Sequence, residues 1–197
     1  MKVPNSLIGA AGEYLVAAEL SRRGWLATVT IKNAPGTDVL AQDLESKRVV
    51  AIQTKTATRE GRWILGRQEE APTTAPDEWF VLVSLGKQSS DQRFWVMPRN
   101  HVAAYIWVGH RLWLRQPGRG GRAHRESAIR NIRTADIAAY EDRWEWLKGP
   151  STDVSYSLLP EWFRDGVRGA DVGLRADHPD VEKLGAVPID LVQAARL

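Results

Sequence analysis

The sequence predicts an α/β protein with a central mixed β-sheet flanked by helices, in an αβββαβ-type order, followed by a C-terminal extension. Apolar residues at helical spacing near the N-terminus give way to β-branched runs that turn residues separate. Two of these runs are apolar on both faces, as in strands buried at the centre of a sheet. The 197 residues are enough for one ordinary domain and an appendage.

The first part of the chain predicts one helix and three strands. Apolar residues recur at helical spacing over residues 5–23, and Gly24 ends that helix after two arginines. Strands are expected at 25–32, 37–42 and 48–57, because β-branched residues are frequent there and turn residues lie between them. The third strand is expected to be central because its Val-Val-Ala-Ile run is apolar on both faces.

The middle of the chain predicts two more strands, at 79–85 and 93–97, and an extended stretch around Trp63. Pro98 is expected to start a short helix over residues 99–106, because proline suits the beginning of a helix. A further helix is expected at 135–147, where four large apolar side chains share one face.

Composition changes at Gly149-Pro150, and we expect a domain at 1–149 and a separate extension at 150–197. The first 149 residues hold 22 basic and 16 acidic side chains, whereas the extension holds 5 and 8. Short helices are expected at 158–163 and 189–197. The acidic extension is interpreted as an addition to the core, a docking site for a protein partner, or a cover that mimics nucleic acid over a basic surface.

Residue usage excludes several kinds of site. The chain has no cysteine, so disulfides, thiolate zinc sites and cysteine nucleophiles are absent. Any metal would be held mainly by oxygen ligands, which favours Mg²⁺ over zinc. No apolar run approaches the roughly 18 residues of a membrane span, and the N-terminus lacks the features of a signal peptide. We therefore expect a cytoplasmic protein without a membrane partner.

Between residues 109 and 133 the chain carries seven arginines and a single acid, Glu126. Guanidinium groups bind phosphate bidentately and displace counterions, so the segment favours nucleic acid as the partner, most simply DNA. The alternative is an ordinary solvated surface. The residues expected to bind nucleic acid are Arg59, Arg111, Arg115, Arg119, Arg122, His124, Arg125, Arg130 and Arg133.

Polar residues interrupt the third strand in a pattern that suits phosphodiester hydrolysis. Gln53 and Lys55 share a face because strand side chains alternate, and a hairpin would bring Asp38 of the preceding strand beside them. Asp38, the Gln53 amide oxygen and the Thr54 carbonyl would then hold Mg²⁺ or Mn²⁺. Lys55 would orient or deprotonate the attacking water, or stabilise the transition state.

Glu13 on the first helix is a candidate for a second acidic ligand. Its helical neighbours are small or apolar, so this glutamate does not lie on a plainly solvated face. The alternative is an ordinary half-exposed helix residue, just as Lys55 alone could be an edge-strand lysine whose stem covers apolar surface.

The order Glu13, then "GTD" ending in Asp38, then "QTK" with Gln53 and Lys55 resembles the PD-(D/E)XK, or restriction-endonuclease-like, nuclease superfamily. Its Holliday-junction-resolvase branch, in which a first-helix Glu joins the motif, is the most similar. The resemblance implies a Mg²⁺-dependent DNA endonuclease of the junction-resolving, repair or defence type, and by analogy a homodimer. Gln53 departs from the pattern, since most of the superfamily has Glu there.

A longer resemblance, over most of residues 5–147, is to a bacterial family of small proteins with this superfamily's core. The stretches "FWVMPRNHVAAYI", "HRLWLRQPGRGGRAH", "AIRNIR" and "YEDRWEWL" carry it. Two readings other than a plain nuclease stay open. One is a catalytically degenerate nuclease fold that binds nucleic acid or a protein; the other is a nuclease that its own extension keeps silent.

Histidines and tryptophans give weaker indications. His110 and His124 bracket the Arg-rich segment and could contact phosphate or assist proton transfer, or could be solvated loop residues. Trp107 and Trp113 flank His110 and could stack on unpaired bases. At least six of the nine tryptophans are expected in the core.

Overall fold

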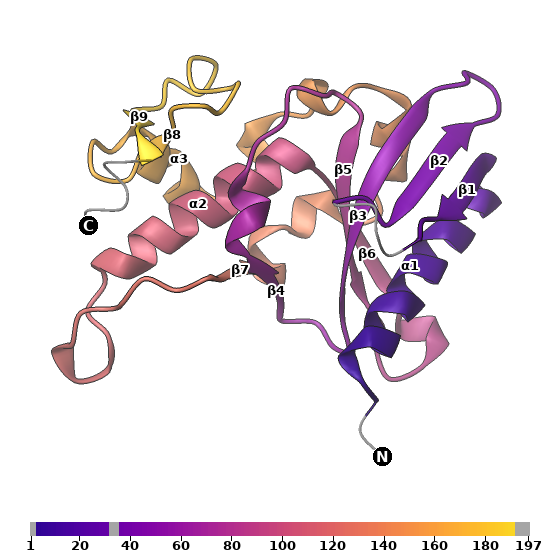
Figure 1. The fold of residues 1–197 in the computed structure, drawn as a ribbon, viewed down its shortest axis with the longest axis horizontal. Helices are drawn as coiled ribbons and strands as arrows, with labels where there is room; N and C mark the ends of the chain where they lie inside the picture. The colour runs from indigo at the N-terminus through magenta and orange to yellow at the C-terminus, as the bar shows by residue number, and fades with distance from the viewer. Residues whose placement is uncertain (1–2, 32–35, 192–197) are drawn as a thin grey trace. The chain divides into compact units, whose positions relative to one another are not determined.

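A five-stranded mixed sheet organises the first part of the computed structural model, which describes residues 3–31 and 36–191. Its strand order is β1-β2-β3-β5-β6, and all neighbours are antiparallel except the central pair β3 and β5 (Figure 1). The strands are β1 (Trp25–Val29), β2 (Val39–Asp43), β3 (Val49–Ala57), β5 (Glu78–Ser84) and β6 (Arg93–Pro98). The expected mixed sheet with a central third strand is therefore confirmed.

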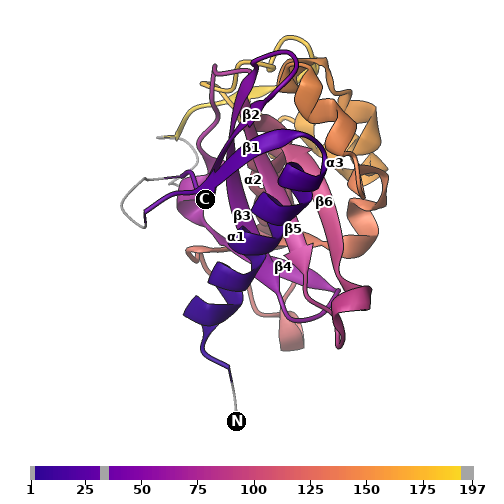
Figure 2. The same cartoon turned by 90° about the vertical axis from the view of Figure 1, so that its right-hand side faces the viewer.

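Helix α1 (Asn5–Arg22) covers one face of this sheet and packs mainly on β1 and β3 (Figure 2). Its buried stripe is Gly12, Val16 and Leu20, spaced one helical turn apart. A Cβ atom added at Gly12 would lie 1.9 Å from Oγ1 of Thr56. Only glycine therefore allows α1 to approach β3 this closely.

Residues 134–148 do not form the expected helix. The chain makes three short 3-10 turns instead, and Asp142 between them adopts a left-handed φ of 52° that an α-helix does not allow. Ile137, Tyr140, Trp144 and Leu147 are nevertheless all buried. The apolar spacing correctly identified core residues, but it did not determine the backbone conformation.

The chain divides into two compact units, and the boundary is not at residue 149. Unit 1 comprises Met1–Trp63, Ala75–Arg99 and Arg133–Ser155, and contains the five-stranded sheet. Unit 2 comprises Ile64–Thr74, Asn100–Ile132 and Tyr156–Leu197. Most of the acidic extension therefore belongs to the same unit as the Arg-rich segment.

Unit 2 is built on helix α2 (Arg99–Arg115), which begins as expected after Pro98 but continues nine residues beyond the expected end at 106. Residues 101–108 are all buried, so neighbouring chain surrounds this part of the helix on every side. Two short sheets accompany it, one of β4 (Arg62–Gly66) with β7 (Ile129–Arg133) and one of β8 (Leu174–Arg175) with β9 (Pro188–Ile189).

Helix α3 (Glu161–Arg168) replaces the helix expected at 158–163. Its Phe163 and Val167 are buried, and so is Leu174 in β8, so the C-terminal residues supply part of the core of unit 2. Strand β9 occupies the start of the helix expected at 189–197, and residues 192–197 lie outside the described part of the chain.

Across residues 3–31 and 36–191, no helix is both long enough and apolar enough to cross a lipid bilayer.

Candidate functional site

The β2–β3 hairpin places Asp38 beside the polar end of β3. Val39 pairs with Ile52 at the last rung of the hairpin, so Asp38 lies just beyond the ladder at this end of β3. The Asp38 N–H donates to the carbonyl of Ile52 at 2.9 Å, which ties its backbone to β3. Asp38 therefore lies beside the segment of β3 that runs through Ile52 and Thr54.

The Asp38 carboxylate takes the place of a strand partner. The ladder with β2 ends at Ile52, and the backbone N–H of Thr54 donates instead to Oδ2 of Asp38 at 2.7 Å. Because ladder hydrogen bonds lie near the plane of a sheet, this bond holds the carboxylate close to that plane. The Thr54 carbonyl points toward the same side of β3 as its N–H, so two oxygen donors face the gap beyond β2.

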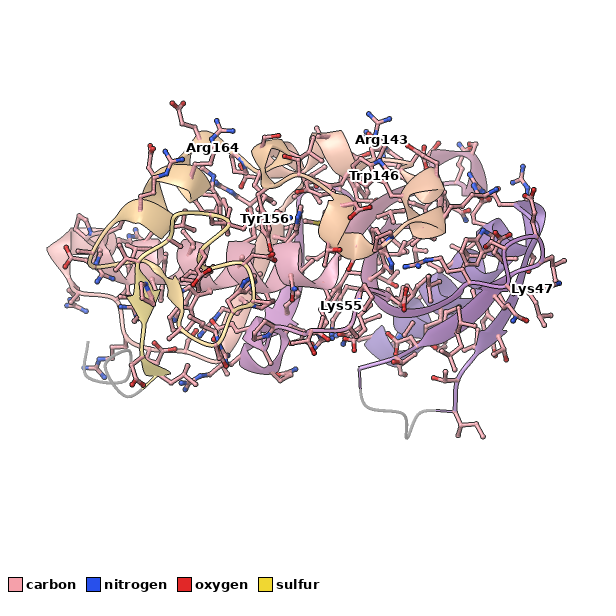
Figure 3. The ribbon with its side chains drawn as sticks, turned by 90° about the horizontal axis from the view of Figure 1, so that it is seen from above. Lys47, Lys55, Arg143, Trp146, Tyr156 and Arg164 are labelled. Carbon is pink, nitrogen blue, oxygen red and sulfur yellow. The ribbon has the colours of Figure 1, made fainter. Side chains whose placement is uncertain are left out.

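Gln53 and Lys55 are half-buried and project from one face of β3, next to Phe80 and Leu82 of β5 in the register. Figure 3 labels Lys55 near the end of β3, with Lys47 at the turn where the hairpin reverses. Asp38 contacts the backbone of Thr54, which lies between Gln53 and Lys55 in the sequence.

Glu13 approaches this region from the other side. It follows Gly12, whose contact with Thr56 shows that α1 lies on the face of β3 that carries Thr54 and Thr56. Gln53 and Lys55 alternate with those threonines and point to the opposite face. Glu13 is half-buried, and its convergence with the other three residues stays a prediction.

The face of β3 under α1 is also polar, in addition to the face predicted from Gln53 and Lys55. The hydroxyl oxygens of Thr54 and Thr56 are buried and have no hydrogen-bond partner among the described residues. Buried polar atoms without partners are rare in proteins and are found at functional or strained positions. The run Gln53-Thr54-Lys55-Thr56 already predicts this polar face, because alternation along a strand places its polar side chains on both faces.

The donor set around Thr54 suits a hard cation. Asp38 supplies carboxylate oxygens, and Gln53 and the Thr54 backbone can supply neutral oxygens, which are ligands that Mg²⁺ and Mn²⁺ accept. Over residues 3–31 and 36–191, no group of three or more His, Asp or Glu side chains is arranged to hold a metal. Any metal here would therefore rest on two acids at most, with neutral oxygens and water completing its shell.

Two of the seven arginines in the Arg-rich segment are interior residues, which corrects their expected role in binding nucleic acid. Arg130 is buried and forms an ion pair with Glu70, which is equally buried. Arg111 is buried and donates to the backbone carbonyls of Val172 and Asp171, both at 3.0 Å. Phosphate cannot reach either guanidinium while these contacts hold.

Arg115 and Arg133 are exposed but already have partners. Arg115 donates to the backbone carbonyls of Arg111 and Asp171, and Arg133 forms an ion pair with Asp136 at 2.8 Å. The contacts from Arg111 and Arg115 to residues of the acidic extension go to backbone carbonyls and not to carboxylates. These contacts support a structural role for the extension and give no support to the nucleic-acid mimic.

The remaining predicted arginines, Arg59, Arg119, Arg122 and Arg125, are exposed. Within the described part of the chain their guanidinium groups make no hydrogen bond or ion pair. Arg59 belongs to unit 1 and the other three to unit 2. These four keep the expected availability for phosphate.

The aromatic candidates also separate by burial. Trp107 is 4% exposed, which corrects its expected role as a base-stacking residue, whereas Trp113 is 36% exposed. Trp25, Trp63, Trp79, Trp95, Trp107 and Trp144 are all buried, which confirms that at least six tryptophans are core residues.

His110 and His124 differ in the same way. Burial and the charge of Arg130 lower the pKa of His110, while Glu126, whose Oε1 lies 2.9 Å from Nε2 of His110, opposes the shift. His110 is buried and its Nε2 contacts Glu126, which corrects the expectation that this side chain contacts phosphate. His124 is half-buried and stacks on Trp113.

No family model and no curated protein sequence matches the chain. Among solved structures, a bacterial homing endonuclease, I-Ssp6803I, is similar to it with a TM-score of 0.43 and 12% sequence identity. The match covers 77% of this chain and 96% of that one. A likeness this weak transfers neither fold nor function, so the function rests on the residues of this chain.

Proposed function

We propose that the protein is a Mg²⁺- or Mn²⁺-dependent DNA endonuclease whose active site lies at the β2–β3 hairpin of unit 1. The observation that carries the proposal is the hydrogen bond from the Thr54 N–H to Oδ2 of Asp38, at 2.7 Å. It holds a carboxylate against the end of β3, the strand that also carries the Gln53 amide, the Thr54 carbonyl and Lys55. An acid that only replaced a strand partner would not require an amide and a lysine on the same strand end.

Asp38 would hold the metal together with the Gln53 side-chain oxygen and the Thr54 carbonyl. A divalent cation bound there supplies two effects, acidification of a water molecule and neutralisation of charge that develops on the phosphate. The hydrogen bond from the Thr54 N–H fixes the orientation of the Asp38 carboxylate beside β3.

Lys55 would act on the reacting phosphate from the face that Gln53 shares. An ammonium group held there stabilises the extra negative charge of the transition state or orients the attacking water. Its half-buried position strengthens this effect, because a partly desolvated charge interacts more strongly than one in bulk water.

Glu13 would be the second acidic ligand, reached through the gap beyond β2. The Asp38 carboxylate lies near the plane of the sheet, so groups on both faces can approach it. The close contact of Gly12 with Thr56 brings the Glu13 turn of α1 down onto that part of β3. The exposed Arg59 would contact the DNA backbone from the same unit.

Cleavage of supercoiled, linear and branched DNA by the full chain, with Mg²⁺, Mn²⁺ or EDTA, tests the proposal. Asp38→Asn keeps an oxygen that can accept the Thr54 N–H but removes the charge, and it should lower the cleavage rate at least about 100-fold. Lys55→Ala should do the same, whereas Lys87→Ala, which removes an exposed lysine elsewhere in unit 1, should not. Cleavage that survives in the Asp38→Ala/Lys55→Ala double variant overturns the assignment.

The alternative is a nuclease-like module that binds nucleic acid without cutting it. The neutral Gln53 favours it, together with the lack of a group of three His, Asp or Glu among the described residues. Calorimetric titration separates the two functions. Mg²⁺ or Mn²⁺ binding that is lost in Asp38→Asn supports the nuclease; no heat at millimolar metal, with salt-sensitive DNA binding intact, supports the module.

A further inference from the structure

The chain between α2 and β7 contains a strongly basic loop, which we define as residues 116–125 (Figure 1). Arg119, Arg122 and Arg125 are its only charged residues, and all three are exposed. Within the described part of the chain none of their guanidinium groups has a hydrogen-bond or ion-pair partner. Three unpaired positive charges on ten residues are suited to an anionic ligand.

The backbone of the basic loop is closed and shaped. Pro117 and Ala123 form an antiparallel bridge, and the Gly118 N–H donates to the Arg122 carbonyl at 2.8 Å. Gly120 and Gly121 reverse the chain with left-handed φ values of 72° and 75°, which favour glycine. The tight reversal therefore presents Arg119 and Arg122 from neighbouring positions.

His124 of the basic loop lies flat on an exposed tryptophan. Its ring centre is 4.0 Å from that of Trp113, with 24° between the ring planes. Trp113 remains 36% exposed with His124 in place. A planar heterocycle stacked on an exposed indole, beside unpaired arginines, has the geometry of a nucleobase on an aromatic platform.

His110 and the groups that it contacts support the Trp113 ring. His110, one turn earlier on α2, stacks with Trp113 at 5.4 Å, and its Nε2 lies 2.9 Å from Oε1 of Glu126. Glu126 also accepts from Arg130 at 3.2 Å, and Arg130 pairs with the buried Glu70. One face of Trp113 thus lies against His110, which Glu126 connects to the buried Arg130 and Glu70, whereas its His124 side faces the loop.

We propose that Trp113 and the basic loop form a binding site for unpaired nucleotides of single-stranded DNA. A base stacks on Trp113 in the place that His124 occupies, and Arg119, Arg122 and Arg125 hold the flanking phosphates. A duplex is a poor ligand, because its bases are already stacked on one another and do not offer a free face to an indole. The site lies in unit 2 and goes beyond the proposed metal site, on which it does not depend.

Binding of labelled 12-nucleotide oligo-dT and of a 12-base-pair duplex, measured by fluorescence anisotropy in EDTA, tests the site without any metal-dependent cleavage. We expect the single strand to bind at least about tenfold more tightly than the duplex. Trp113→Ala should weaken single-strand binding about tenfold or more, while Trp113→Phe, which keeps an aromatic face, should stay within about threefold. Circular dichroism melts confirm that both variants fold.

Two further variants separate stacking from charge. His124→Ala removes the ring that competes with a base and should tighten binding. Arg119→Ala/Arg122→Ala/Arg125→Ala should lower the slope of log K against log salt by about 2, since each lost phosphate contact removes about 0.7. The control is Arg168→Ala, which removes an exposed arginine elsewhere in unit 2. It should change the affinity for the single strand and the salt slope less than the triple variant does.

Equal binding of single strand and duplex, or a Trp113→Ala variant that binds as tightly as the parent, overturns the site. Weaker binding by His124→Ala overturns the exchange of His124 for a base. A parallel titration with oligo-rU identifies the source of the unpaired bases: tighter binding of dT supports DNA, and tighter binding of rU overturns DNA as the ligand. Because EDTA is present throughout, these outcomes are independent of whether unit 1 cleaves DNA.

Discussion

The β2–β3 hairpin of unit 1 and the Arg-rich segment of unit 2 are the two regions whose sequences point to nucleic acid, and they follow different rules. In the hairpin, position along a strand decides which groups lie together, and alternation alone puts Gln53 and Lys55 on one face of β3. In the Arg-rich segment, burial decides which groups are available: Arg130 is inside the protein, whereas Arg122 is on its surface. A local pattern predicts the first arrangement well, but composition predicts the second poorly.

The largest expected effect separates buried from exposed arginines. Arg130→Ala should lower the free energy of unfolding by about 3–5 kcal/mol, because it leaves Glu70 charged and unpaired in the interior. Arg122→Ala should change it by less than about 0.5 kcal/mol, as exposed substitutions usually do. Urea unfolding followed by circular dichroism measures both, and equal small losses would contradict the division of the segment by burial.

The next effect tests the packing that brings α1 onto β3. Gly12→Ala should destabilise unit 1 by about 1–3 kcal/mol, because the new Cβ would overlap Oγ1 of Thr56. Gly9→Ala is the matched control, since its nearest neighbour is 4.0 Å away and alanine favours helix by up to about 1 kcal/mol. Thermal unfolding of the two variants should shift in opposite directions; two similar shifts would show that α1 is not seated on β3 through Gly12.

The third effect uses the histidines, all four of which belong to unit 2. Burial lowers the pKa of His178, although its bond to the Asn100 carbonyl and the nearby Asp180 and Asp177 oppose the shift. Burial likewise lowers the pKa of His110. The unfolded chain therefore takes up protons below about pH 6.5 while these folded histidines stay neutral, so stability falls as pH falls through that window.

Acidification from pH 7 to pH 5.5 should thus destabilise unit 2 more than unit 1, by at most about 1.4 kcal/mol per pH unit for each of His110 and His178. Hydrogen exchange, corrected for the intrinsic exchange rate, reports the two units separately. His178→Gln cannot take up a proton and should reduce the acid-dependent loss. Equal losses in both units would argue against histidine as the cause.

The smallest effect concerns Gln53. Gln53→Glu should tighten Mg²⁺ binding roughly tenfold, about 1.4 kcal/mol, by adding a carboxylate next to Asp38. Gln53→Ala should weaken binding by a similar or smaller factor, and calorimetric titration measures both. The same Kd for Mg²⁺ in the parent protein and in both variants would exclude Gln53 as a metal ligand. The hairpin would then lack one of the ligands proposed for its metal site.

Sequence patterns that are local carried most of the fold prediction. The helix beginning at Asn5, the strands of the sheet and the hairpin around Asp38 follow from alternation, helical spacing and turn residues, which act over a few positions. Where the backbone conformation depends on distant contacts, the same patterns predicted the wrong element or the wrong end of an element. Residues 134–148 bury the expected side chains without forming a helix, and α2 extends well beyond residue 106.

The sequence by itself thus determined the first helix and the sheet strands of unit 1 and the shared face of Gln53 and Lys55, because helical spacing and strand alternation need only neighbouring residues. Only the tertiary structure decided which arginines stay on the surface and that residues 156–191 complete unit 2. The physical reason is that burial and ion pairing depend on distant partners: Glu70 reaches Arg130 from 60 residues away, and the Val172 carbonyl reaches Arg111 from 61.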